Sequence, residues 1–298
     1  PTTPAPPCPP RPARTPVRAR RVASAFSISV LFKSSGPTAQ ALAALGRAAE
    51  EAGQSDRAVE YYRQAIVADA DFAPAHFNLG LLLLAGANNC EAEASFRETL
   101  RLRQAFPEAW VALADALEEQ GRDTEALEAL NNAIAQRPDY EGALMNASTL
   151  LQKMGRLEEA ERSYRRLVER APDSPAASNN LGNVLHTLGR AAEAEPFFRN
   201  SLRLAPESAV AHSNLANALR DLGRLAEAEA SCCEALRLDP SLPEAHNHLG
   251  NILQALGRAA DSEASLRRAL ELKPAYREAH NSLGNSLKDQ GRLAEAQA

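Results

Sequence analysis

The chain has 298 residues, of which 45% are hydrophobic and only 5% aromatic, and its formal net charge is −5. This apolar content excludes disorder throughout the chain, and few aromatic residues beside abundant Ala and Leu favour thin, repetitive helices over a large globular core. The charge excludes a general basic surface for nucleic acid, and no apolar run approaches the roughly 18 residues of a membrane span. Four Cys residues in so long a chain form no disulfide framework, so the composition favours a cytoplasmic protein.

Residues 1–36 differ from the rest of the chain. They contain six basic residues, no acidic residue and eight of the 19 prolines. Such a segment has little apolar surface to bury and cannot keep helical hydrogen bonds, so we expect a disordered tail. Its one apolar run, Val22–Phe32, follows Arg20 and Arg21 but is short, contains three Ser and lacks a clear small-residue cleavage site. We therefore do not expect export.

A 34-residue repeat organises residues 39–298. It is most visible at His212, His246 and His280, which are spaced by 34 residues. Within each repeat, Leu, Ala and aromatic residues recur at three- and four-residue spacing, which predicts two amphipathic helices. Seven full repeats begin at residues 39, 73, 107, 141, 175, 209 and 243, and a truncated eighth begins at 277.

Three places in the repeat mark the ends and contacts of these helices. The eighth is always Gly, Ala or Ser, which permits two helices to approach closely. The fifteenth is Gly in seven of eight repeats, as a helix end with positive φ requires, and Ala87 is the exception. The thirty-second is Pro in five repeats, just past the second helix. Pro196 departs from the pattern because it lies close to the start of its predicted second helix.

These features resemble the tetratricopeptide repeat, with Trp110 at the fourth place, Leu at the seventh, an aromatic residue at the twenty-fourth and a late Pro. The resemblance covers residues 39–298. It implies an all-α fold, a right-handed superhelical solenoid of helix-turn-helix repeats whose first helices line a concave groove. It also implies that the groove binds a protein or peptide. Because the last repeat ends inside its second helix, with no capping helix, we expect the sequence to be a fragment of a longer protein.

Asparagines recur on the predicted groove side of the first helices, at the sixth and ninth places of the repeat. A side-chain amide both donates and accepts, so a column of them can bond the backbone of an extended peptide with little regard to its sequence. Two interpretations stay open, namely peptide contact and hydrogen bonding between neighbouring repeats or to solvent. Under the first, the candidate peptide-binding residues are Asn78, Asn146, Asn180, Asn183, Asn214, Asn217, His248, Asn251 and Asn285.

The asparagines of the sixth place resemble those that line the superhelix of O-linked N-acetylglucosamine transferases. His248 and Ser282, at the same place, depart from this resemblance. The residues that carry this resemblance best are Asn78, Asn146, Asn180 and Asn214. It implies an alternative function, in which the chain is the substrate-recognition region of a larger glycosyltransferase whose catalytic domain lies outside these 298 residues. A third alternative is a structural scaffold that self-associates.

An apolar groove patch is predicted in the N-terminal repeats. It consists of Phe77, Leu81, Leu84, Val111 and Met145. The first three lie at i, i+4 and i+7 and share one helix face, whereas the last two occupy the same fifth place as Phe77. An exposed strip of this kind is typical of a partner site, and the chain's own apolar run in the tail is one candidate occupant. The alternative is that these side chains belong to the core.

No motif for catalysis, phosphate binding or metal binding is present in the sequence, so we expect no enzymatic activity, no cofactor and no metal site. Cys232 occupies the aromatic column and is expected to be buried as a small apolar residue. Packing between helices is expected at the fourth place for His76, His212, His246 and His280. Interaction with the dipole at the start of the second helices is expected for Glu125, Glu159, Glu193 and Glu227.

Overall fold

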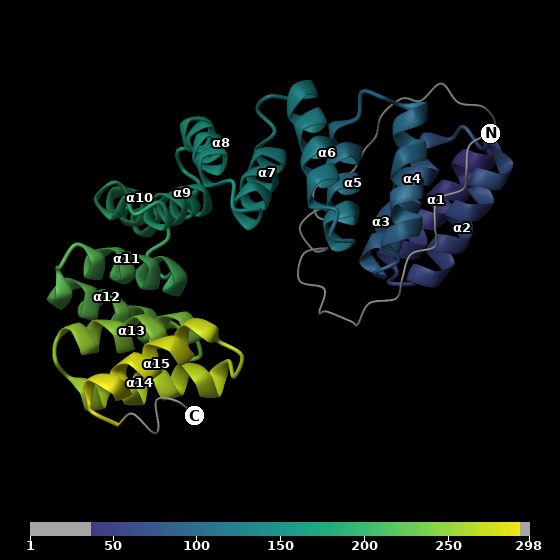
Figure 1. Cartoon of the computed structure of the whole chain (residues 1–298). Coiled ribbons are helices and arrows are strands. Elements are labelled where there is room, and N and C mark those ends of the chain that lie inside the picture. Colours follow the sequence, from purple (N-terminus) through teal and green to yellow (C-terminus); the bar gives the residue numbers. More distant parts are fainter. Residues whose placement is uncertain (1–36, 293–298) are drawn as a thin grey trace. The chain divides into compact units, whose positions relative to one another are not determined.

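The computed structural model describes residues 37–292, and this range contains 15 α-helices and no strand (Figure 1). The first helices of the repeats are α1 (Pro37–Glu51), α3 (Ala73–Ala85), α5 (Pro107–Glu119), α7 (Glu141–Lys153), α9 (Pro175–Thr187), α11 (Ala209–Asp221), α13 (Pro243–Ala255) and α15 (Arg277–Asp289). The second helices are α2 (Ser55–Ala68), α4 (Asn89–Leu102), α6 (Asp123–Gln136), α8 (Leu157–Arg170), α10 (Ala191–Leu204), α12 (Leu225–Leu238) and α14 (Ala259–Leu272). The predicted tail, residues 1–36, lies outside the described residues. None of the described helices has the length and apolar character needed to cross a membrane.

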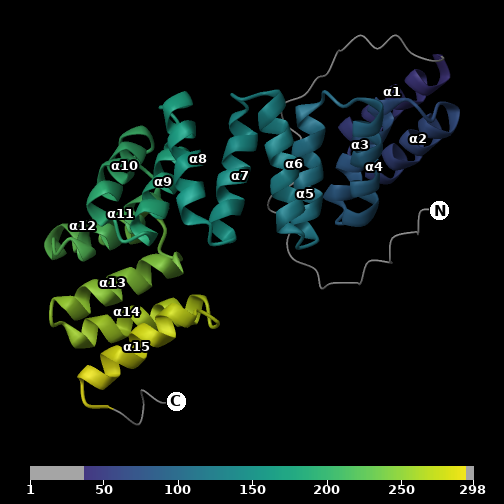
Figure 2. The same ribbon diagram turned by 45° about the horizontal axis from the view of Figure 1, so that its top comes forward.

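The chain divides into two compact units, one ending at Leu150 and the other beginning at Leu151, within α7. In unit 1, the hairpins α1–α2, α3–α4 and α5–α6 follow one another, with α2 packed against α3 and α4 packed against α5. In unit 2, the hairpins α9–α10, α11–α12 and α13–α14 do the same and end on α15, while α8 packs against α9 (Figure 2). The expectation that residues 39–298 form one continuous solenoid stays a prediction.

Each hairpin closes where the eighth place of the repeat meets the twenty-fourth. A Cβ atom built on Gly80 would lie 2.6 Å from the Phe96 ring, and one built on Gly182 would lie 2.7 Å from the Phe198 ring. Both rings are almost fully buried. Atoms in a well-packed interior do not approach so closely without forcing a side chain or the backbone to shift. The expected close approach at the eighth place is therefore present, and the buried ring is its cause.

The turn inside each hairpin depends on the fifteenth place. The glycines there have φ between 71° and 77°, the left-handed region that side chains disfavour. At Gly121 the N–H donates to the carbonyl of Glu118, and the next N–H, that of Arg122, donates to the carbonyl of Leu117. These two bonds satisfy carbonyls that the end of α5 would leave unpaired. The predicted positive φ is confirmed.

The aromatic and imidazole side chains of the fourth place bond to the turn that precedes their helix. Nε2 of His212 lies 3.0 Å from the carbonyl oxygen of Pro206, and Nε1 of Trp110 donates to the carbonyl of Gln104 at 3.4 Å. The same contact, six residues back, is made by His76, His246 and His280. We expected packing alone, but these side chains also hold the connection between consecutive repeats.

Candidate functional site

The first helices of unit 2 contact one another in chain order, α9 with α11, α11 with α13 and α13 with α15. We call the surface formed by their sixth and ninth places the first-helix face of unit 2. These places are three residues apart and therefore lie on one side of a helix. At the sixth place the residues are Asn180, Asn214, His248 and Ser282, and at the ninth they are Asn183, Asn217, Asn251 and Asn285. All are half-buried except Asn285, which is exposed.

At the sixth place, several polar side chains form hydrogen bonds with other residues of the protein. The Asn214 amide donates to Oδ1 of Asn179 at 3.0 Å, and Nδ1 of His248 lies 2.9 Å from the hydroxyl of Ser213. Both bonds join the fifth place of one repeat to the sixth place of the next. Asn180 also lies within this network, because the amide of Asn179 approaches its Oδ1 at 3.5 Å. Hydrogen bonding between neighbouring repeats is therefore observed at two residues of this column, Asn214 and His248.

Burial fixes the charge state of His248. Loss of solvent around the ring, and secondarily the charge of Arg220, lower the pKa of His248 to about 4. The ring is therefore neutral near pH 7, and its Nδ1 can accept a hydrogen bond from the hydroxyl of Ser213. This places His248 in the contact between α11 and α13. Its predicted role in binding a peptide is untested.

The ninth-place amides have a different environment. Asn183, Asn251 and Asn285 form no side-chain hydrogen bond within residues 37–292. The side-chain oxygen of Asn217 is buried and accepts no hydrogen bond. The nitrogen on the other side of the same amide is then the atom that can donate to a ligand. Four consecutive repeats thus carry an amide at one place, none of which bonds another described residue.

Charged and polar side chains line the C-terminal ends of these helices. Nε2 of His186 lies 2.8 Å from Asp221, Arg220 also donates to Asp221 at 2.7 Å, and the Gln254 amide donates to Asp289 at 2.6 Å. Burial alone would raise the pKa of Asp221, but the Arg220 guanidinium and the bond to His186 hold it below its usual range. This rim is polar and internally paired, beside the ninth-place amides.

In unit 1, the predicted asparagines do not form a comparable column. The amide of Asn146 donates to Oδ1 of Asp115 at 3.3 Å, so it links two repeats. Asn78 is half-buried beside the Tyr62 hydroxyl, with which it forms a hydrogen bond. The ninth place holds Arg47, Leu81, Asp115 and Thr149 instead of asparagine. The asparagine column therefore belongs to unit 2.

The apolar patch predicted for unit 1 is corrected at two of its residues. Phe77 and Val111 are only 6% and 5% exposed, and the Phe77 ring packs 4.7 Å from that of Phe106. The fifth place is turned toward the neighbouring repeat, so apolar residues there join the core. Leu81, Leu84 and Met145 are half-buried.

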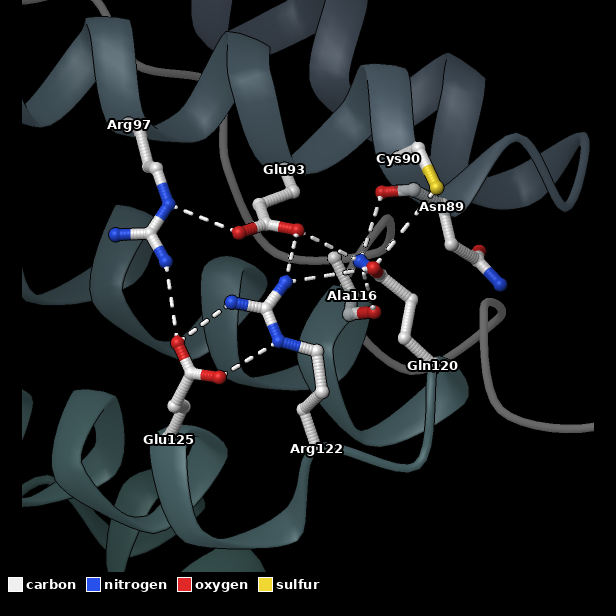
Figure 3. A network of polar contacts seen from close by, with 8 residues as sticks. All are labelled: Asn89, Cys90, Glu93, Arg97, Ala116, Gln120, Arg122 and Glu125. Carbon is white, nitrogen blue, oxygen red and sulfur yellow. Dashed lines mark hydrogen bonds and ion pairs between the residues drawn. The ribbon is translucent and has the colours of Figure 1, made fainter. Parts of the chain in front are cut away.

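The sequence did not reveal a network of ion pairs between repeats. Arg122, which directly follows the turn glycine, pairs with Glu125 on its own helix and with Glu93 of the preceding repeat at 2.6 Å (Figure 3). The pair 29 residues apart recurs at Arg190–Glu161, Arg224–Glu195, Arg258–Glu229 and Arg292–Glu263. The available signal was an Arg directly after the turn glycine together with a Glu 29 residues before that Arg, a combination that is absent at Gly53 and Gly155. The acidic residues assigned to the helix dipole therefore also pair with arginine.

Two other expectations concern cysteine and metal. Cys232 is fully buried, its thiol donates to the carbonyl of Ala245 at 3.1 Å, and burial raises the pKa of the Cys232 thiol to about 12. It packs as the small apolar residue that we expected. Within residues 37–292, no group of three or more His, Cys, Asp or Glu side chains is placed to hold a metal ion.

The sequence matches a model described as "Tetratricopeptide repeat" at residues 43–89, 145–209 and 248–298, and a second model of that description at 107–150. A model described as "TPR repeat" matches residues 216–257. No curated protein matches the chain.

Three solved structures show the same fold. A tetratricopeptide repeat protein from Parabacteroides merdae has a TM-score of 0.66 at 17% identity, over 85% of this chain and 100% of that one. YrrB, a TPR protein "with an unusual peptide-binding site", has a TM-score of 0.50 at 17% identity, over 62% of this chain and 95% of YrrB. A chain of the APC/C hetero-tetramer Cut9–Hcn1 has a TM-score of 0.63 at 19% identity. The match covers 84% of the present chain but only 48% of the Cut9–Hcn1 chain. These likenesses confirm the all-α solenoid fold.

Proposed function

Because the chain belongs to the tetratricopeptide repeat family, a fold typical of protein–protein interaction, we propose that it binds an extended peptide along the first-helix face of unit 2. The observation that carries the proposal is the ninth-place column, Asn183, Asn217, Asn251 and Asn285, whose amides bond no other described residue. The sixth-place side chains support this column by fixing the repeats that present it.

The spacing of the column suits a peptide backbone. Packed helices lie about 8–10 Å apart, so equivalent places of consecutive repeats are separated by roughly that distance or slightly more. An extended chain rises about 3.3 Å per residue, so one asparagine would meet every third residue of a bound peptide. An amide can donate to a backbone carbonyl or accept from a backbone N–H, which makes such contacts independent of the peptide's side chains. The solved structure of YrrB is described as having a peptide-binding site, which supports a similar use of this fold here.

The test replaces Asn183, Asn217 and Asn251 with Ala in the full chain. Each lost hydrogen bond is worth about 1 kcal/mol, so affinity should fall at least about tenfold, and up to about a hundredfold if the effects add. The probe is a set of 12-residue peptides selected from a displayed random library on the wild-type chain and measured by fluorescence anisotropy. The exposed Asn131, on the second helix α6, is the control, and Asn131→Ala should leave affinity unchanged.

A second variant separates binding from stability. Asn214→Ala removes the bond to Asn179, so it should lower the melting temperature, whereas the triple variant should retain the wild-type value. Selected peptides that bind the triple variant as tightly as the wild type would rule out the ninth-place column as the site.

The resemblance to O-linked N-acetylglucosamine transferases supports a second proposal, in which the same face holds polypeptide substrates for a glycosyltransferase domain of a longer protein. The observation that favours it is the ninth-place column, which lies on the same face as Asn180 and Asn214, two of the residues that carry the resemblance. Under this proposal, selected peptides should be rich in Ser and Thr, the acceptors of such an enzyme. A peptide set without these residues would favour a binding scaffold instead.

A further inference from the structure

Charge is distributed very unevenly along the chain. Residues 37–150 contain 18 acidic and 8 basic residues, a net charge of −10, whereas residues 151–298 contain 20 acidic and 19 basic residues. Residues 1–36 contain six basic residues and no acidic residue. The most basic segment of the chain thus directly precedes α1, the first helix of its most acidic unit. Opposite charges held this close in sequence attract one another, because their encounter is intramolecular.

In unit 1, α3 carries partly exposed apolar side chains near its C-terminal end, where the neighbouring first helices α1 and α5 carry acidic ones. On α3, Leu81 and Leu84 are half-buried and Ala85 is exposed. The thirteenth place, held by Ala85 in α3, is held by Glu51 in α1 and by Glu119 in α5, and both carboxylates are exposed. Neither carboxylate forms an ion pair with another residue in the range 37–292. Three consecutive first helices therefore present an acidic, an apolar and an acidic side chain in turn.

The tail contains the complementary order of residues. The apolar run Val22–Phe32 is preceded by Arg20 and Arg21 and followed by Lys33. Within the run, bulky apolar residues recur at every second position from Phe26 to Phe32. A segment with this pattern can offer one apolar side to a partner, with a positive charge at each end.

We propose that this surface of unit 1, formed by Glu51, Leu81, Leu84, Ala85 and Glu119, binds the chain's own segment Val22–Phe32. The apolar run covers the exposed parts of the leucines, and the basic residues at its two ends pair with the two carboxylates. A tether of only four residues between Phe32 and α1 raises the effective concentration of the segment to about the millimolar range, so a weak contact is sufficient. The surface is separate from the ninth-place column of unit 2, and the proposal does not depend on peptide binding there.

Hydrogen exchange of the full chain, followed by mass spectrometry, tests the proposal. Amides of Val22–Phe32 should exchange about tenfold or more slowly than those of a synthetic peptide of residues 17–36 under the same conditions. Higher salt should reduce this protection, because the pairing charges lie at the surface. Equal exchange rates in the chain and in the peptide would overturn the proposal.

The variant Leu81→Ser/Leu84→Ser should bring exchange in the segment to the rate of the free peptide. Val67→Ser is the matched control, because Val67 is 89% exposed on α2 and lies outside the surface. Circular dichroism establishes that each variant remains helical. Protection that survives in a folded double variant would exclude this surface.

Charge reversal tests the same contact without touching an apolar residue, so it remains decisive if the leucine variant does not fold. Glu51→Lys/Glu119→Lys should abolish protection, whereas Glu158→Lys/Glu207→Lys, two exposed acidic residues of unit 2, should retain it. Equal protection in both variants would overturn the pairing.

Replacing the basic residues of the tail, Arg20, Arg21 and Lys33, with Glu should abolish protection in the otherwise wild-type chain. The same replacement in the Glu51→Lys/Glu119→Lys chain should restore protection. Failure to restore it would contradict direct pairing. Protection that disappears on dilution would assign the bound segment to a second copy of the chain and overturn the intramolecular contact.

Discussion

Among residues 37–292, Ala87 is the non-glycine residue with a positive φ, 59°. Its turn has the same bonds as those built on glycine, because the N–H of Ala87 donates to Leu84 and that of Asn88 to Leu83. The left-handed region costs an L-residue about 1–2 kcal/mol, partly offset in glycine by the greater entropy of its unfolded chain. Ala87→Gly should therefore raise the free energy of unfolding by about 1 kcal/mol in urea titration.

The reverse substitution is the control for this prediction. Gly155→Ala occupies the same place of the repeat, has no atom within 4 Å of its added Cβ, and should lower the free energy of unfolding by a similar amount. Unchanged stability in Ala87→Gly would show that the backbone cost is compensated elsewhere in the turn.

At this scale, the sequence predicted what one repeat determines by itself. The turn glycines and the small eighth place follow from local backbone conformation and from a ring 16 residues further on, as at Gly182 and Phe198. The sequence could not show that the sixth-place asparagines bond within the protein whereas the ninth-place asparagines do not. The bond from Asn214 to Asn179 depends on the register between two helices whose bonded side chains are 35 residues apart, and asparagine alone does not reveal whether its amide is already paired. The same limit explains why Phe77 was assigned to the surface.

Single helices follow the repeat closely, and α10 contains the main departure. Pro196 lies inside this helix, at its sixth residue, and its side chain is exposed. Proline lacks the N–H that would bond the carbonyl four residues back, and its ring clashes with that carbonyl, at a cost of about 3 kcal/mol in a helix interior. Pro196→Ala should therefore raise the free energy of unfolding by about 1–3 kcal/mol, measured by urea titration with circular dichroism.

Ala230 is the matched control, because it occupies the same exposed place in α12. Ala230→Pro should lower stability by about as much as Pro196→Ala raises it. If both substitutions were neutral, the second turn of these helices would contribute little to stability. Helix ends were predictable because Gly and Pro mark them, whereas the local cost of Pro196 depends on how far into the helix it lies.

Over the whole molecule, the two units differ in how their carboxylates are stabilised. Among the residues of unit 2 that the structure describes, nine acidic groups have a pKa below the usual range, owing mainly to hydrogen bonds from Arg and, for Asp239, from Ser241. In unit 1, only three do. Burial instead raises the pKa of Glu50, in unit 1, although its bond with Tyr62 opposes this. Among the described residues, this difference arises because Arg–carboxylate pairs three or four residues apart in the chain, such as Arg190–Glu193 and Arg224–Glu227, are more frequent in unit 2 than in unit 1.

The expected consequence is that unit 2 unfolds first as the pH falls. A carboxylate whose folded pKa is lowered stabilises the protein above its unfolded value of about 4.3, and this stabilisation is lost as the pH falls through the folded pKa. Glu50 has the opposite sign, because protonation relieves its burial, and acid also neutralises the excess negative charge of unit 1.

Pulsed hydrogen exchange after equilibration between pH 6.5 and 3 can follow the two units separately. Peptides from residues 151–292 should lose protection about half a pH unit or more above those from 37–150. Glu195→Gln removes one carboxylate that Arg199 and Arg224 stabilise, so it should lower stability at neutral pH and reduce the difference between the units in acid. If unit 1 lost its protection at the higher pH, repulsion among its acidic groups would contribute little to its stability. Packing, not ion pairing, would then set the order of unfolding.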